Sequence, residues 1–166
     1  MYVLTIPVYL HFLGTADLLL EKAEVFCAEQ GADGTSLLEC RLAEDMFPFA
    51  KQIQLTTDFA TRAADRLAGR EIRSFPDTET TLAELRARVA AAREYLKGFA
   101  PAEFEGAKTR EITIQTRQGP IIMNGEQFLE TYSKPQFFFH LTTAYDLLRQ
   151  KGLPLGKSDF MNVARR

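Results

Sequence analysis

The fold is decided by residues 9–27, whose sequence is YLHFLGTADLLLEKAEVFC. Near-heptad spacing of apolar residues, by fours and threes, is typical of a helix packed inside a helical bundle. We therefore expect a first helix over about residues 5–30, ended by Gly31 and the following Asp33-Gly34 pair. The apolar residues that recur at these spacings are Tyr9, Leu13, Ala16, Leu20, Ala23 and Cys27.

The second expected helix covers about residues 36–67 and keeps one apolar face. Pro48 lies inside this pattern, where it removes a backbone donor and clashes with the preceding turn. We therefore expect a kink or a break near Met46.

Two more helices follow. The third covers about residues 82–97 and begins at a capping box formed by Thr81 and Glu84. The fourth covers about residues 125–151 and should be kinked at Pro135. Asn124 can cap it, with Gln127 three residues on.

The segment 111–123 has a different character, because Ile112 and Ile114 alternate with polar residues at strand period. A turn signal at residues 118–120 separates it from a second apolar run. The prediction is a mainly all-α protein, an antiparallel four-helix bundle with a small β-hairpin between the third and fourth helices. We expect one domain over residues 1–166.

The net charge of -2 offers no basic excess for a polyanion, which disfavours nucleic-acid binding. Cys27 and Cys40 fit neither a disulfide framework nor a paired metal-binding spacing, so we expect two buried, reduced thiols. The apolar N-terminus has no basic leader region, and Pro7, Gly14 and Asp17 interrupt it. These features predict a cytoplasmic protein without a membrane span.

A second apolar stripe of the first helix faces away from its core seam. Other parts of the chain, such as the hairpin and the C-terminal tail, cover this stripe, or a second subunit does. We expect a homodimer, since twofold oligomers are common. The stripe repeats every seven residues at Leu4, His11, Leu18 and Val25, and Phe12, Leu19 and Phe26 widen it.

The candidate site centres on His140 of the last helix. Gln136 lies one turn before it, while Asp45 and Gln52 are seven residues apart and share a face of the second helix. His140 is the candidate metal ligand or general base, and Asp45 the residue that orients it or completes the ligand set. A single histidine at a core edge is more often simply hydrogen-bonded, and an amide oxygen is a weak ligand for a transition metal.

Four runs of sequence resemble a bacterial domain-of-unknown-function family, number nineteen-ninety-three. That family is similar to the DinB-like, or YfiT-like, metalloenzyme superfamily. The resemblance spans nearly the whole chain. The four runs are RLAEDMFPFAKQIQ (41–54), ETTLAELRAR (79–88), FFHLTTAYDLLR (138–149) and GLPLGKSDF (152–160).

The resemblance implies a four-helix bundle, often dimeric. In many members nickel or zinc is held by one histidine of the second helix and a His-x-x-x-His pair of the last. Some relatives are thiol-dependent transferases. Here Gln136 takes the first position of the pair, and the second-helix position falls on Gln52, or by a shift on Gln54 or Asp45. Only His140 of the three histidines is present.

Two functions are therefore open. The first is a binding bundle without catalysis and without a cofactor. The second is an altered metal-dependent enzyme, hydrolase-like or thiol-transferase-like, that uses a pocket around His140. Nothing in the residues names a small-molecule ligand or decides whether the protein is an enzyme.

Overall fold

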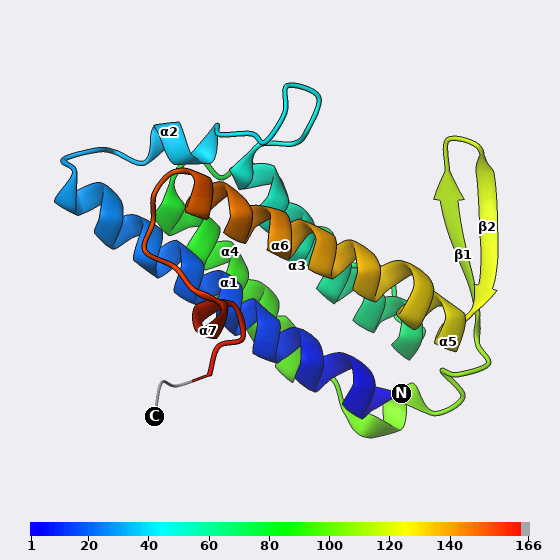
Figure 1. The fold of residues 1–166 in the computed structure, drawn as a ribbon. Helices are drawn as coiled ribbons and strands as arrows, with labels where there is room; N and C mark the ends of the chain where they lie inside the picture. Colours follow the sequence, from blue (N-terminus) through cyan, green and yellow to red (C-terminus); the bar gives the residue numbers. More distant parts are fainter. Residues whose placement is uncertain (164–166) are drawn as a thin grey trace.

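The computed structural model of the protein describes residues 1–163 (Figure 1). Residues 164–166, which the single-domain prediction included, lie outside this range. Four long helices dominate: α1 (Tyr2–Glu29), α3 (Phe49–Ala68), α4 (Leu82–Lys97) and α6 (Lys134–Gln150). The short elements are α2 (Thr35–Leu38), η1 (Pro101–Phe104), β1 (Glu111–Thr116), β2 (Gly119–Asn124), α5 (Gly125–Gln127), η2 (Phe128–Ser133) and α7 (Lys157–Phe160).

Side-chain pairs show that α3 and α4 run in the same direction. Arg88 of α4 bonds Asp58 of α3, and Tyr95, seven residues further along α4, bonds Asp65, seven residues further along α3. Partners that advance together along both helices require a parallel pair. Figure 1 shows both helices running away from the end of the bundle where α2 lies.

The other principal helix pairs are antiparallel. Arg86 of α4 binds Glu24 of α1, whereas Arg93, later in α4, faces Asp17, earlier in α1. Helices α3 and α6 also run in opposite directions. The bundle therefore consists of two antiparallel pairs, α1 with α4 and α3 with α6 (Figure 1). The expected mostly helical fold with a small hairpin is confirmed.

The hairpin lies where the alternation placed it, between α4 and the last helical region. β1 and β2 pair antiparallel, with Ile112 opposite Met123 and Ile114 opposite Ile121. Ile112 and Ile114 are buried while their neighbours in β1 are exposed or half-buried, as the period of two predicts. A two-stranded ribbon is marginal alone, so this buried face supplies its support.

The second expected helix is broken, and its prediction as one helix over 36–67 is wrong for residues 39–48. α2 ends at Leu38, and α3 begins at Phe49, directly after Pro48. Pro48 has an extended backbone, with φ -70° and ψ 166°, and Pro also disfavours a helical conformation for the residue before it. The expected break near Met46 is confirmed.

The last helical region is not a uniform α-helix. Asn124 and Gln127 form the expected capping box at the start of α5. The π-helical turn η2 then precedes α6, in which Pro135 is the second residue. The irregularity that was expected at Pro135 therefore takes the form of a π-helical turn just before it.

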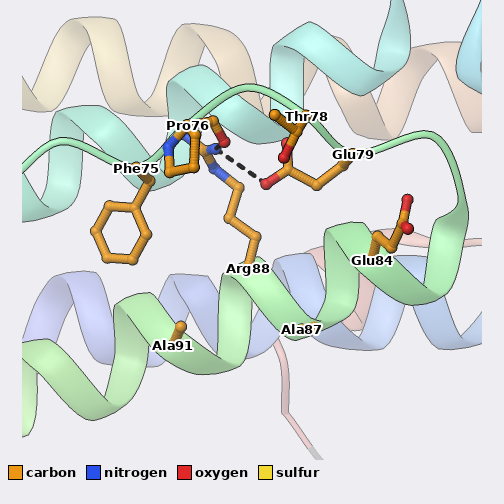
Figure 2. Close-up of a pocket in the computed structure, with 8 residues that line it drawn as sticks. All are labelled: Phe75, Pro76, Thr78, Glu79, Glu84, Ala87, Arg88 and Ala91. Carbon is orange, nitrogen blue, oxygen red and sulfur yellow. Dashed lines mark hydrogen bonds and ion pairs between the residues drawn. The ribbon is translucent and has the colours of Figure 1, made fainter.

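Residues 70–80, the crossover segment, carry the chain back along the bundle so that α4 can start beside the start of α3. The 20 residues of α3 extend about 30 Å, which 11 extended residues can span. Figure 2 shows Arg88 of α4 pointing into this segment beside Glu79 and Phe75. Its guanidinium lies 3.1 Å from Glu79 and 3.2 Å from Asp77, and it also bonds Asp58 of α3 at 2.8 Å. This one side chain joins three parts of the fold.

Helix α1 contributes a full face to the core, with Tyr9, Leu13 and Leu20 fully buried along the predicted seam. Its length and hydropathy alone would suffice for a membrane span. Of its most apolar 18-residue window, 44% is buried in the structure, and a helix from the core of a soluble protein can pass the same test of length and hydropathy. Cys27 and Cys40 are free and buried, as expected.

The outward stripe of α1 is covered in part by the end of the chain. The ring of Phe160 in α7 lies 5.9 Å from that of Phe12, and Lys22 binds Asp159 at 2.7 Å. Leu4 and Val25 stay 50% and 54% exposed. The tail therefore covers the middle of the stripe and leaves both ends open.

Candidate functional site

His140 of α6 and Gln52 of α3 form a buried hydrogen-bonded pair. His140 Nδ1 lies 2.7 Å from Gln52 Oε1, and Gln52 Nε2 donates to the carbonyl oxygen of Phe47 at 3.0 Å. Since the amide nitrogen is used on Phe47, the amide oxygen faces the imidazole. His140 therefore carries its proton on Nδ1 and donates it to Gln52.

Two aromatic rings enclose the imidazole. Phe59 of α3 stacks on His140 with ring centroids 5.5 Å apart and an interplanar angle of 12°, and Phe139 meets it edge-on at 5.3 Å. Burial, and after it the positive charge of Lys51, lower the pKa of His140 from 6.5 to about 4. At neutral pH the ring is therefore uncharged, and Nε2 keeps its lone pair.

Asp45 does not belong to this pair. It lies in an exposed turn before α3, because the helix starts only at Phe49. The prediction that Asp45 and Gln52 share a helical face is therefore wrong, since it assumed a continuous helix across Pro48. The group that orients the imidazole is the amide of Gln52 and not a carboxylate.

The remaining predicted residues also stand apart from the imidazole. Gln136 lies one turn before His140 and is half-buried, without a hydrogen bond to it among residues 1–163. Gln54, the alternative second-helix position, donates to Glu79 of the crossover segment at 2.9 Å and so serves another part of the fold. The structure thus brings together His140 and Gln52 only.

The donor set at this place does not fit nickel or zinc. Within residues 1–163 no group of three or more His, Cys, Asp or Glu side chains is arranged to hold a metal ion. One imidazole remains as a strong ligand, and both ends of the Gln52 amide are already hydrogen-bonded. Three-ligand zinc sites use imidazole, thiolate or carboxylate groups, for which an amide is a poor substitute.

A cavity of about 170 Å³ lies near Phe59 and is not lined by His140. Arg62 and Arg66 of α3 contribute to it, together with Tyr132 of η2 and Gln115 of β1. This cavity was not predicted from the sequence, because the hairpin and the π-helical turn assemble it. The spacing of two arginines one turn apart was the signal available in the sequence.

The hollow of about 310 Å³ in Figure 2 is a less suitable site. It lies between the crossover segment and α4, and Arg88 is its only cationic lining residue. The Arg88 guanidinium already bonds Thr57, the carbonyl oxygen of Pro76 and a carboxylate on each terminal nitrogen. A ligand would find few donors left there.

Comparison with known proteins agrees with this fold. The model of the family described as a domain of unknown function (DUF1993) matches residues 1–161. The crystal structure of a DinB family member from Shewanella denitrificans is 36% identical, with a TM-score of 0.92, and the match covers 99% of this chain and 93% of that one. No curated protein matches the chain. The chain therefore belongs to the DUF1993 family and shares the fold of the DinB family.

Proposed function

We propose that this protein is a cytoplasmic, dimeric, non-catalytic binding bundle of the DinB type. In this proposal the His140–Gln52 pair replaces a three-histidine metal site with a structural hydrogen bond. The observation that supports it is the closed chain from His140 Nδ1 through the Gln52 amide to the Phe47 carbonyl. His140 Nδ1 and both ends of the Gln52 amide are paired in this chain, as a structural role requires.

Metal content tests the proposal. Protein purified without an affinity tag should contain no stoichiometric nickel or zinc, and adding either metal should leave its melting temperature unchanged. The matched variant Gln52→His/Gln136→His restores the histidine positions of the resemblance and should gain both metal and a higher melting temperature. Stoichiometric metal in the wild-type protein, with stabilisation on adding it, would refute the proposal.

A second candidate function is an altered enzyme of hydrolase or thiol-transferase type. It is favoured by the neutral state of His140, whose low pKa leaves the Nε2 lone pair free at pH 7 to accept a hydrogen bond from water or a thiol. Wild-type protein and His140→Gln would be compared on activated esters and on thiol conjugation, with Gln136→Ala as the control. Equal rates for all three proteins would exclude this candidate.

Dimerisation and location are separate parts of the proposal. The exposed side chains of Leu4 and Val25 on α1 offer the surface for a second copy. Light scattering at micromolar concentration should give twice the monomer mass, and Val25→Asp should reduce it. A monomeric wild-type protein counts against the dimer, and recovery with the membrane fraction counts against the cytoplasm.

A further inference from the structure

The cavity at Phe59, here the arginine cavity, is lined by residues of three elements. It holds about 170 Å³. Helix α3 supplies two guanidinium groups and an aromatic ring, η2 supplies two further rings and hydroxyl groups, and β1 supplies an amide. The residues used below are Phe59, Arg62, Arg66, Phe128, Tyr132 and Ser133.

The arginine cavity carries a positive charge that the protein neutralises incompletely. Arg62 pairs with Asp58 at 2.7 Å, but the same carboxylate also binds Arg88 at 2.8 Å. Within residues 1–163 no carboxylate lies at ion-pair distance from Arg66, whose Nη1 reaches only the carbonyl oxygen of Arg62, at 3.4 Å. Burial and the like charge of Arg62 lower the pKa of Arg66. Asp65 and Tyr132 act in the opposite direction, and an anion beside Arg66 would add to their effect by stabilising the charged guanidinium.

The aromatic side chains that line the arginine cavity suit a flat apolar ligand. The rings of Phe128 and Tyr132 stack with centroids 5.9 Å apart, and Phe59 lies 6.3 Å from Tyr132. The guanidinium of Arg66 sits 6.0 Å from the Phe128 ring. The Tyr132 hydroxyl has no hydrogen-bond partner within residues 1–163, so it is available to a ligand. π-Helical turns such as η2 often occur at functional sites.

We propose that the arginine cavity binds a small aromatic carboxylate of about the size of benzoate. Its carboxylate pairs with Arg66 and accepts a hydrogen bond from Tyr132, and its ring packs against Phe59 and Phe128. The size agrees, since a protein cavity of about 150 Å³ is known to hold benzene. This assignment rests on the proposed binding function and gives it a ligand class, but it uses no atom of the His140–Gln52 pair.

Calorimetric titration of the wild-type protein tests the assignment without any variant. Benzoate should bind with one-to-one stoichiometry and at least tenfold more tightly than benzamide, its neutral isostere. Inorganic phosphate, the probe for a bare anion site, should bind more weakly than benzoate. Equal affinities for benzoate and benzamide, absence of benzoate binding, or tighter binding of phosphate would each overturn the proposal.

A charge-matched pair of variants locates the binding. Arg66→Gln should weaken benzoate binding at least tenfold, whereas Arg117→Gln, which removes the same charge from the exposed hairpin turn, should leave it unchanged. Equal weakening by both variants would mean attraction by bulk charge and would refute the site. If Arg66→Gln does not fold, as judged by circular dichroism, the benzoate and benzamide comparison decides. Metal binding by the wild-type protein would refute the proposed function and leave this result standing.

Discussion

Replacing Arg88 by leucine tests whether this buried side chain holds α3, α4 and the crossover segment together. The Arg88 side chain is 2% exposed, and the Asp58 and Glu79 side chains that it binds are 6% and 11% exposed. Leucine retains much of the apolar stem of arginine and removes its charge. The carboxylates would then stay buried with fewer cations and hydrogen bonds, which is the costly way to break an ion pair.

The expected loss in the free energy of unfolding is about 3–5 kcal/mol, as for other buried ion pairs that lose one partner. For a protein of this size it corresponds to a fall in melting temperature of about 6–20 °C. Arg86→Leu is the matched control on the same helix. Arg86 binds two carboxylates, but its side chain is 32% exposed and its partners are similarly exposed. We expect this control to cost only about 1 kcal/mol.

Urea unfolding followed by circular dichroism at pH 7 measures both changes. Burial raises the pKa of Asp58 in spite of Arg62 and Arg88, and losing Arg88 raises it further. A carboxyl group whose pKa is raised on folding destabilises the fold when ionised, so the penalty should shrink as the pH falls toward that pKa. Equal losses for Arg88→Leu and Arg86→Leu at pH 7 would refute this account of the crossover segment.

Four further substitutions have outcomes set by the geometry. Gln52→Leu leaves the Nδ1–H of His140 without its acceptor and should cost about 1–3 kcal/mol in urea unfolding. Because folding lowers the pKa of His140 from 6.5 to about 4, its contribution to stability should decline as the pH falls through that interval. His140→Phe should remove this part of the pH profile, and an unchanged profile would contradict the assignment. A Cβ at Gly125 would lie 1.9 Å from the carbonyl oxygen of Ala107, so Gly125→Ala should cost about 3 kcal/mol in thermal unfolding. Gly14→Ala in α1 meets only the end of a flexible side chain and should change stability by less than about 1 kcal/mol.

Local pattern was enough to predict most elements. The spacing of Tyr9, Leu13 and Leu20 identified the buried face of α1, because helical period alone decides which residues share a face. The capping box of Thr81 and Glu84 is present at the start of α4. These features depend on residues within one or two turns of each other.

The features that the sequence did not reveal depend on distant contacts. The parallel course of α3 and α4 is seen in contacts such as that of Arg88 with Asp58, 30 residues apart. No local sequence pattern predicts such a contact. Asp45 was misplaced because a helix was extended through Pro48. The arginine cavity needs β1 and η2 beside Arg66, so only the assembled fold displays it.

The partnership of α1 with α4 has a consequence for synthesis on the ribosome. α1 is the most apolar long helix and is made first, yet its contact with Arg86 joins residues 62 and 69 positions apart in the chain. At a translation rate of about 5–20 residues per second, the apolar helix α1 remains without its partner for several seconds before α4 is synthesised. The nascent polypeptide should therefore engage chaperones early. Its release from them should coincide with the completion of α4.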